Sequence, residues 1–324
     1  GDVVADDAMG GDTAPHSVVE GVRKAVASGG LSVLLVGEEA VLRPLVGDDD
    51  RIAVRHASGV VAQDADPVEA VRGDAGASIV VAARAVRDGE AQALVSAGHS
   101  GATLAAATLV IGRAPGVARP GLAAVLPGAT GPTVLIDAGA NLDTTAPQLH
   151  AFAHLGSAFA EHLLGIAAPT CGLLAIGEEP GKGDARTKEA HALLAGDAGL
   201  DYRGSVEGRD VLASTVDVIV ADGFAGNVAL KACEGTAREA FRRVRAEATG
   251  LRGALGGLLL RPALRRVRAR LDPDTYGGAH LLGANAVVLI AHGAARPHGI
   301  ARACRYAAEG VERDLVGAIA RRVG

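Results

Sequence analysis

The chain has 324 residues, of which 49% are hydrophobic and 21% are charged, a composition typical of a large folded domain and not of a disordered chain. Lys and Arg number 32 against 37 Asp and Glu, so the net charge of −5 gives no general attraction for nucleic acid. Trp is absent, and three Tyr and four Phe offer few surfaces on which bases could stack. We therefore expect no nucleic-acid partner.

The cysteines and the apolar runs indicate the compartment. Cys171, Cys233 and Cys304 are far apart and odd in number, which argues against a disulfide framework and favours a reducing environment. No apolar run reaches the roughly 18 residues that cross a bilayer. The first residues also lack the basic and apolar pattern of a signal peptide. The sequence predicts a cytoplasmic protein.

Apolar runs alternate with helical patterns along the chain. Strand, glycine-rich turn and helix in repeated order indicate a parallel sheet covered by helices. No linker or repeat divides the sequence, so we expect one α/β domain over residues 1–324, with two interlocked lobes. In chain order the predicted elements are strand 3–7, helix 15–28, strand 31–36, helix 66–86, strand 93–96, helix 100–111, strands 122–126 and 134–137, helix 146–165, strand 172–176, helix 184–196, strand 216–221, helix 223–248, strand 286–290 and helix 299–322.

Polar, glycine-rich segments follow many of these strands. Glycine amides at a strand end, next to a helix N-terminus, can form a cradle for an anion. The alternative is that each segment is ordinary turn chemistry, but several cradles with cations nearby favour an anionic ligand. The segments are DAMGGD (7–12), SAGHSGA (96–102), DAGAN (137–141), IGEEPGKGDARTKEAH (176–191), GSVEGRD (204–210), DGFAGNVALK (222–231) and YGGAHLLG (276–283).

The standard catalytic and cofactor signatures are absent. No GxGxxG follows the first strand, and no GxSxG occurs. The segment GEEPGKG (177–183) is one residue shorter than a P-loop and lacks the Ser or Thr that would hold magnesium. No HExxH or comparable metal-ligand spacing is evident among the ten histidines. We therefore expect neither a cofactor nor a metal.

Taken in order, these motifs closely resemble those of the bacterial phosphate acyltransferase family of glycerolipid synthesis (PlsX), from about residue 3 to residue 320. The resemblance implies transfer of a fatty acyl group from acyl carrier protein (ACP) to inorganic phosphate, which yields acyl phosphate for phospholipid synthesis. It also implies a three-layer α/β sandwich with a mostly parallel sheet, like isocitrate dehydrogenases and phosphotransacetylases, with a protruding helical pair. A homodimer at the membrane surface, which hands its product to a membrane glycerol-phosphate acyltransferase, is implied as well.

The sequence departs from the family pattern at two places. His99 and Ser100 stand where the family usually has Asn and Thr, and Ala175 stands where we expect Asn. Two other functions remain open: a phosphotransacetylase-like enzyme acting on a short acyl-CoA, and a membrane-associated scaffold without catalysis.

The reaction needs a phosphate cradle, donors for the carbonyl oxyanion and proximity. Phosphate is already an anion, and the leaving thiol has a pKa of roughly 8.5, so no Ser-His-Asp triad is required. Lys182 and Lys231, with the amides near Gly226, are expected to hold phosphate or to stabilise the oxyanion. Asn227 and His99 are expected to donate to the thioester carbonyl. Further residues expected to bind phosphate or substrate are Asp7, Gly10, Gly11, Ser100, Gly101, Asn141 and Glu178.

Several of these polar residues have a structural alternative. Asp7 and Asp12 are expected either to fix the first turn or to orient basic partners. Asp222 and Glu178 have the alternative of being buried structural carboxylates, and Asn141 that of satisfying a turn.

Residues 236–271 carry ten Arg against two Glu. Leu260 and Leu264 recur at helical spacing, with Arg265 and Arg268 beside them, so a basic amphipathic helix is predicted. Such a helix can contact anionic lipid or an acidic carrier protein, or it can bury its leucines in a dimer. Pro262 and the pair 256–257 are expected to divide this protrusion into two helices.

Overall fold

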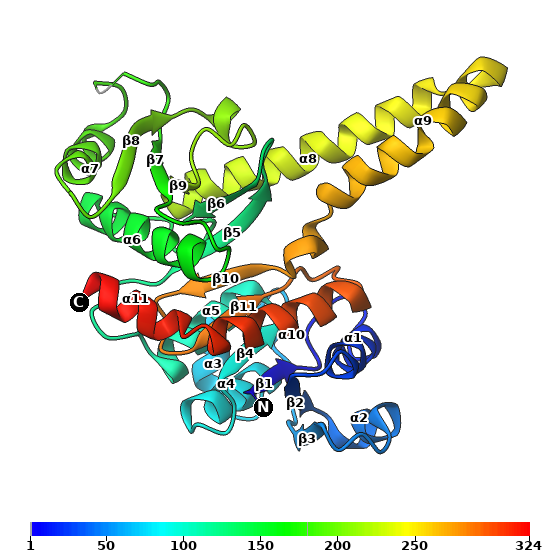
Figure 1. Ribbon diagram of the computed structural model, residues 1–324. Helices are drawn as coiled ribbons and strands as arrows, with labels where there is room; N and C mark the ends of the chain where they lie inside the picture. Colours follow the sequence, from blue (N-terminus) through cyan, green and yellow to red (C-terminus); the bar gives the residue numbers. More distant parts are fainter. Residues whose placement is uncertain (1, 180) are drawn as a thin grey trace.

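The computed structural model describes residues 2–179 and 181–324 (Figure 1). A single 11-stranded sheet runs through it, in the order β3-β2-β1-β4-β11-β10-β5-β6-β9-β7-β8. The strands are β1 (Asp2–Asp7), β2 (Leu31–Gly37), β3 (Ile52–His56), β4 (Ala93–Ser96), β5 (Gly121–Pro127), β6 (Pro132–Ile136), β7 (Thr170–Leu174), β8 (Asp201–Val206), β9 (Val218–Val220), β10 (Ala279–Leu282) and β11 (Val287–Ile290).

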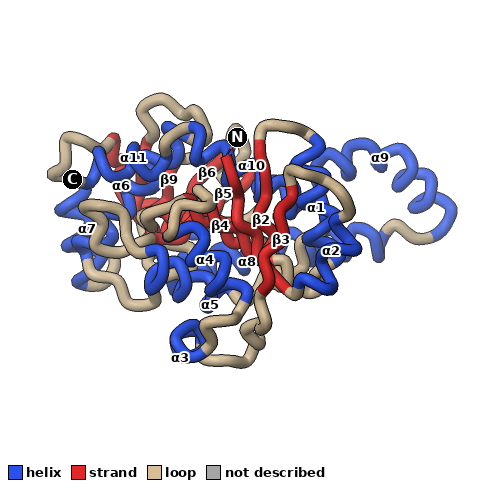
Figure 2. The backbone as a smooth tube through the Cα atoms, turned by 90° about the horizontal axis from the view of Figure 1, so that it is seen from below, coloured by secondary structure: helices blue, strands red, loops and turns tan. Residues whose placement is uncertain are grey.

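Helices cover both faces of this sheet (Figure 2). The α-helices are α1 (His16–Ala27), α2 (Glu39–Val46), α3 (Pro67–Gly73), α4 (Ser78–Arg87), α5 (Ser100–Ala106), α6 (Ala146–His162), α7 (Ala185–Ala195), α8 (Gly223–Glu247), α9 (Gly250–Arg270), α10 (Pro297–Glu312) and α11 (Leu315–Val323). A π-helical turn, η1 (Ala107–Ile111), extends α5, and two 3-10 helices are η2 (Gly208–Asp210) and η3 (Pro273–Tyr276).

The middle of the sheet is antiparallel. β10 runs antiparallel to both β11 and β5, and β5 runs antiparallel to β6, whereas all other neighbouring strands are parallel. The strands of the first lobe (β3 to β11) therefore run opposite to those of the second lobe (β6 to β8). The register nevertheless aligns Ile136, the last residue of β6, with Val95 of β4, through Ala123, His280 and Leu289. The two sets of parallel strands therefore point in opposite directions, and their carboxyl ends reach nearly the same level in the middle of the sheet.

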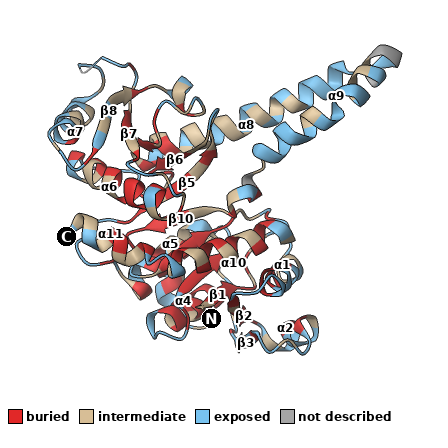
Figure 3. Ribbon diagram, in the orientation of Figure 1, coloured by how far each residue is buried: buried red, intermediate tan, exposed pale blue. Residues whose placement is uncertain are grey.

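The apolar core lies between the sheet and the helices that cover its two faces. One apolar cluster joins α1, α6, α7, α10 and α11 on one face of both lobes. On the other face, α4 and α5 cover the first lobe, while α8 contributes Leu230 and Cys233 to the cluster over the second. Strands such as β4 and β9 are buried along their whole length, as expected for parallel strands covered on both faces (Figure 3). The predicted α/β fold with a mostly parallel sheet is confirmed.

Helices α8 and α9 project away from the body as a pair, which we call the arm (Figures 1 and 3). The prediction that Pro262 and residues 256–257 would divide the arm is wrong, because α9 is continuous through them. The break lies instead between the helices, at 248–249, where Gly250 has a φ of +71°. Pro262 is exposed, so solvent can satisfy the backbone group that it leaves unpaired.

Some elements were missed or merged by the sequence prediction. The strands β3, β8 and β10 were not expected, since none has a long apolar run. The predicted helix 66–86 is divided into α3 and α4, and the predicted helix 299–322 into α10 and α11. Within residues 2–179 and 181–324, we find no helix that combines the length and the apolar character needed to cross a membrane.

Candidate functional site

A buried carboxylate organises the turn after β6. Asp137 Oδ1 accepts hydrogen bonds from the amides of Leu122, Gly139 and Ala140, and its Oδ2 accepts from the amide of Asn141. The side chain of Asn141 donates to Asp137 Oδ2 (2.9 Å) and to the carbonyl of Pro120 (2.8 Å). Both amide hydrogens of Asn141 are thus in use, which favours its turn-holding role over direct contact with substrate.

The N-terminus of α8 lies against this turn. Asp222 caps the helix by accepting from the amides of Phe224 and Ala225, at 3.0 and 2.9 Å. The amide of Gly223 donates to the Asn141 carbonyl (2.8 Å), and that of Gly226 to the Asp222 carbonyl (2.8 Å). The whole first turn of α8 is therefore satisfied by the protein, and a carboxylate already occupies the position where a phosphate would bind.

This arrangement corrects one prediction from the sequence. The amides near Gly226 were expected to hold phosphate, but they donate to protein acceptors. Gly226 is needed for another reason: a Cβ at this position would overlap the carbonyl oxygen of Asp137. The glycine lets α8 approach the turn at 137–141 at backbone distance.

Asn227 and Lys231 lie one helical turn apart on α8. Asn227 Nδ2 donates to the carbonyl of Ala138 (3.0 Å), which fixes its amide at the turn after β6. Lys231 Nζ lies 3.2 Å from Glu234, whose other carboxylate oxygen lies 3.4 Å from His292 Nε2. The hydrogen bond from His292, together with Lys231, lowers the pKa of Glu234, so this carboxylate stays ionised.

Helix α8 connects the two lobes through these contacts. His292 follows β11, and the carbonyl of Gly293 accepts from the amide of Asp12 in the loop after β1 (2.8 Å). Lys231 is consequently close to the loops that follow the strands of the first lobe, although α8 begins at the turn after β6 in the second lobe.

The loops after β1 and β4 form a second polar region. Gly10 and Gly98 are in contact, since a Cβ on Gly10 would lie 2.6 Å from the Gly98 nitrogen. Asp7 Oδ2 accepts from Ser96 Oγ (3.0 Å) and its Oδ1 from the amide of Met9 (3.3 Å), so Asp7 fixes the first turn. Burial raises the pKa of Asp7.

His99 caps α5 from this second region. Its Nδ1 accepts from the amide of Ala102 (3.2 Å), so the ring hydrogen is on Nε2, where it can be donated to a ligand. In the described part of the chain, the amides of Ser100 and Gly101 donate to no protein acceptor. A pocket of about 200 Å³ lies beside His99. Its lining includes Asp7, Gly10, Gly11 and Gly98 and the apolar Val60, Val61, Ala62 and Ile79, whereas Ser100 and Gly101 are outside it.

Glu178 and Lys182 lie in the described residues 175–179 and 181–184, which we call the 175–184 loop. Glu178 is not buried: its carboxylate lies 3.4 Å from the exposed Arg209. Lys182 is exposed, and among described residues no contact joins its ammonium group to His99 or Asn227. Helix α7, which follows the loop, is connected to α8 through Arg186, whose guanidinium donates to Asp222 (3.0 Å).

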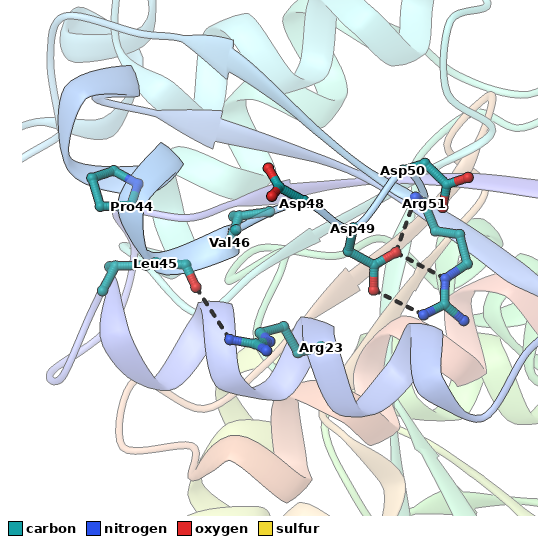
Figure 4. Close-up of a pocket in the computed structure, with 9 residues that line it drawn as sticks. Arg23, Pro44, Leu45, Val46, Asp48, Asp49, Asp50 and Arg51 are labelled. Carbon is teal, nitrogen blue, oxygen red and sulfur yellow. Dashed lines mark hydrogen bonds and ion pairs between the residues drawn. The ribbon is translucent and has the colours of Figure 1, made fainter.

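Another surface hollow lies away from these residues (Figure 4). It has a volume of about 540 Å³ and lies at the edge of the sheet between α1, α2 and β3. Arg51 pairs with Asp49 there (2.8 Å), and Arg23 donates to the Leu45 carbonyl (3.4 Å). Among the described residues that line it, none was predicted to bind substrate, so we do not assign it to the site.

Some residues of the site were missed at the sequence level. Arg186 and Glu234 are ordinary charged residues in helical patterns, and nothing in their spacing marks their ion pairs. Asp137 was visible as the first residue of DAGAN, a strand-end motif, but its role as acceptor for the whole turn depends on the fold.

Comparisons with known proteins agree with this architecture. A family model described as "Fatty acid synthesis protein" matches residues 3–317. A phosphate acyltransferase from Thermobifida fusca (strain YX) is 48% identical over 312 residues, which cover 94% of this chain and 86% of that protein. A second, from Streptococcus pneumoniae (strain ATCC 700669 / Spain 23F-1), is 42% identical over 322 residues and covers 98% of both chains. The chain belongs to the phosphate acyltransferase family.

Solved structures of other proteins have a similar fold at low sequence identity. A phosphotransacetylase from Streptococcus pyogenes superposes with a TM-score of 0.65 at 19% identity, covering 96% of this chain and 94% of that one. The EutD phosphotransacetylase from Staphylococcus aureus gives 0.61 at 16% identity, covering 95% and 94%. The predicted phosphotransacetylase-like fold is confirmed, as are the predicted family and the assignment of the chain as an acyltransferase enzyme.

Proposed function

We propose that this phosphate acyltransferase moves a fatty acyl group from ACP to inorganic phosphate and releases acyl phosphate for phospholipid synthesis. The observation that carries this proposal is the group of donors around the pocket at His99. His99 lines this pocket, and its Nε2 hydrogen has no acceptor in the described part of the chain. The amides of Ser100 and Gly101, which follow His99 at the start of α5, also lack a protein acceptor there, and the pocket is large enough for a phosphate.

The reaction follows from these donors. A phosphate oxygen attacks the thioester carbonyl carbon, a C–O bond forms, and the carbonyl electron pair moves to the oxygen. Hydrogen bonds from His99 and Asn227 stabilise this oxyanion. The C–S bond then breaks, and the sulfur of the carrier leaves as a thiolate, which takes a proton from water.

Lys182 and Lys231 supply the positive charge. Both ammonium groups are exposed, and Lys231 is held near the first-lobe loops by Glu234. We assign both to neutralising phosphate and the developing oxyanion, while Gly10 and Gly11 let the phosphate approach the backbone.

The surroundings of Asn227 suit an apolar substrate. Phe224 and Val228 lie one turn apart on α8 and are 65% and 52% exposed, on either side of Asn227 in the sequence. Large apolar side chains are usually buried, so this exposed pair beside a polar amide is a reasonable contact for an acyl chain.

We assign the arm to association. We propose a homodimer, located in the cytoplasm at the membrane surface, with residues 1–324 acting as one catalytic unit. Leu260 is 57% exposed, Leu264 is half-buried, and Arg265 and Arg268 are exposed, which suits contact with an anionic membrane and with acidic ACP. At that surface the acyl phosphate passes to a membrane glycerol-phosphate acyltransferase.

The arm can be tested separately from catalysis. The double variant Arg265→Glu, Arg268→Glu should weaken binding both to anionic liposomes and to ACP, with the acyl transfer from saturating substrate retained. Unchanged binding to both would remove the surface role and leave the dimer as the function of the arm.

The reaction is tested with purified protein, palmitoyl-ACP and inorganic phosphate, by following release of the ACP thiol and trapping acyl phosphate with hydroxylamine. Release that depends on phosphate supports the proposal. Faster transfer from a short acyl-CoA than from palmitoyl-ACP would support a phosphotransacetylase-like activity instead. No release from either donor would favour a non-catalytic scaffold.

A further inference from the structure

Two histidines and an aspartate converge on the second lobe, outside the candidate site. His150 and His154 lie one turn apart on α6, and Asp197 follows the end of α7. The Nε2 atoms of both histidines lie 2.7 Å from the same carboxylate oxygen of Asp197. The two rings meet edge to face, with their centroids 5.1 Å apart.

Two of the three residues are recognisable in the sequence. His150 and His154 have the i, i+4 spacing of two ligands on one helix face, which the sequence prediction overlooked. Asp197 lies 43 residues beyond His154, and only the packing of α7 against α6 brings it to the pair.

We propose that His150, His154 and Asp197 bind one divalent transition-metal ion with the coordination preferences of zinc. One ligand atom from each residue lies within 4.8 Å of the other two, and two imidazoles with one carboxylate are a common zinc donor set. A tetrahedral zinc ion places its ligand atoms roughly 3.3 Å apart, so the 2.7 Å contacts need to open by only about 0.6 Å. A water molecule completes the coordination.

The hydrogen bonds of the cluster suit a metal. Both histidine Nε2 atoms face Asp197 Oδ2, and the amide of Gly199 donates to Asp197 Oδ1 (2.8 Å), which holds the carboxylate in place. On metal binding, the hydrogen of each ring moves from Nε2 to Nδ1, and the Nε2 lone pair becomes the ligand.

The neighbours of the cluster define its selectivity and strength. Two imidazole nitrogens disfavour magnesium and calcium, which prefer oxygen ligands. Arg322 donates to the Gly199 carbonyl (3.4 Å), and its positive charge lowers the affinity of the cluster for any cation. His154 Nδ1 is buried without a partner among the described residues, so the outer hydrogen bond that usually strengthens such a site is missing. We therefore expect moderate affinity.

A second cluster, formed by Asp272, Asp274 and His298, is less suitable. Arg296 lies 3.0 Å from Asp272 and 3.7 Å from Asp274, so a guanidinium already neutralises both carboxylates. This contrast favours the cluster on α6, where no Lys or Arg of the described chain pairs with Asp197.

Metal binding would brace the second lobe. The ion would link α6 to the C-terminal end of α7, and the first turn of α7 carries Arg186, which pairs with Asp222 at the start of α8. The proposal is independent of the reaction described above, because none of the three ligands lines the pocket at His99.

The test is calorimetric titration of the full chain, without a histidine tag and treated with chelator, with zinc in excess magnesium. We expect one zinc ion per chain and about a 100-fold loss of affinity in His150→Ala, with unchanged binding in His162→Ala on the same helix. Asp197→Asn, which keeps the shape of the side chain, should weaken binding as well. Circular dichroism confirms that each variant is folded.

Cobalt provides a second readout for the same variants. Wild-type protein loaded with cobalt should show the visible bands of a tetrahedral ion, and His150→Ala should lose them. Equal zinc affinity in the wild type and His150→Ala, or no binding to the wild type at excess zinc, would overturn the proposal.

Discussion

Two regions that were predicted to act together differ sharply in the number of contacts that hold their polar side chains. The junction, residues 137–141 with 222–227, is closed: Asp137 accepts from four backbone amides, and Asp222 caps α8 and pairs with Arg186. The 175–184 loop is open: Glu178 meets only an exposed arginine, and Lys182 is exposed.

This difference gives the junction a positioning role and the 175–184 loop a role in the reaction itself. In the junction the polar groups satisfy one another, so its task is to hold Asn227 in a fixed place, and changes there act through the structure. At Glu178 and Lys182 few contacts oppose a substitution, so changes at these two residues act on the reaction and leave stability almost unaffected.

The largest expected effect is in the junction. Gly226→Ala should destabilise the fold by several kcal/mol or prevent folding, because the added Cβ overlaps the Asp137 carbonyl and neither backbone can move freely. Gly235→Ala on the same helix is the matched control. No atom lies near its Cβ, so it should raise stability by about 1 kcal/mol. Thermal unfolding of both proteins measures the contrast. A Gly226→Ala protein as stable as the wild type would show that the junction is looser than described.

The second prediction compares the two regions through function. Lys182→Ala and Asn227→Ala should each lower the turnover of acyl-ACP by more than tenfold, which corresponds to more than about 1.4 kcal/mol in the barrier. Asn227→Ala should also lose about 1 kcal/mol of stability with its hydrogen bond to Ala138, whereas Lys182→Ala should unfold like the wild type. Parallel turnover and unfolding measurements decide this, and a wild-type rate for either variant would remove that residue from the site.

The same contrast explains what the sequence could predict. Apolar runs followed by glycine-rich turns were enough for β1, β4 and β6. Leucines among arginines indicated the helix α9, but the break between the two helices of the arm was predicted at the wrong place. These signals are local. The antiparallel middle strands are not local: β10 lies between β11 and β5 by long-range pairing, and its four residues carry no distinctive pattern.

The candidate site shows the same limit. DGFAGN correctly indicated a strand end followed by a helix, but sequence cannot show that Asp222 folds back onto the first amides. The anion cradle predicted there is therefore filled by the protein itself. For His99, the motif at the strand end indicated a hydrogen-bond donor. In the structure its Nδ1 accepts the hydrogen bond that caps α5, so Nε2 is the nitrogen that can donate.

The smallest expected effect concerns the end of the 175–184 loop. Asp184 caps α7 by accepting from the amide and hydroxyl of Thr187, both at 2.7 Å, and its side chain is 61% exposed. Asp184→Ala should therefore cost about 1 kcal/mol of stability. Asp222→Ala should cost more, because it removes a half-buried cap and leaves Arg186 without its partner.

The pH dependence of this loss identifies its origin. The hydrogen bonds from Thr187 lower the pKa of Asp184 below its ordinary value of 3.8, so the charged cap stabilises the folded chain above that pH. Its contribution is lost as the pH falls through the lowered pKa. The difference in unfolding free energy between the wild type and Asp184→Ala should shrink in acid, whereas Asp184→Asn, which caps without a charge, should keep a constant advantage over Asp184→Ala. A gap between wild type and Asp184→Ala that does not change with pH would mean that the carboxylate acts only by its shape, and that the 175–184 loop is held from elsewhere.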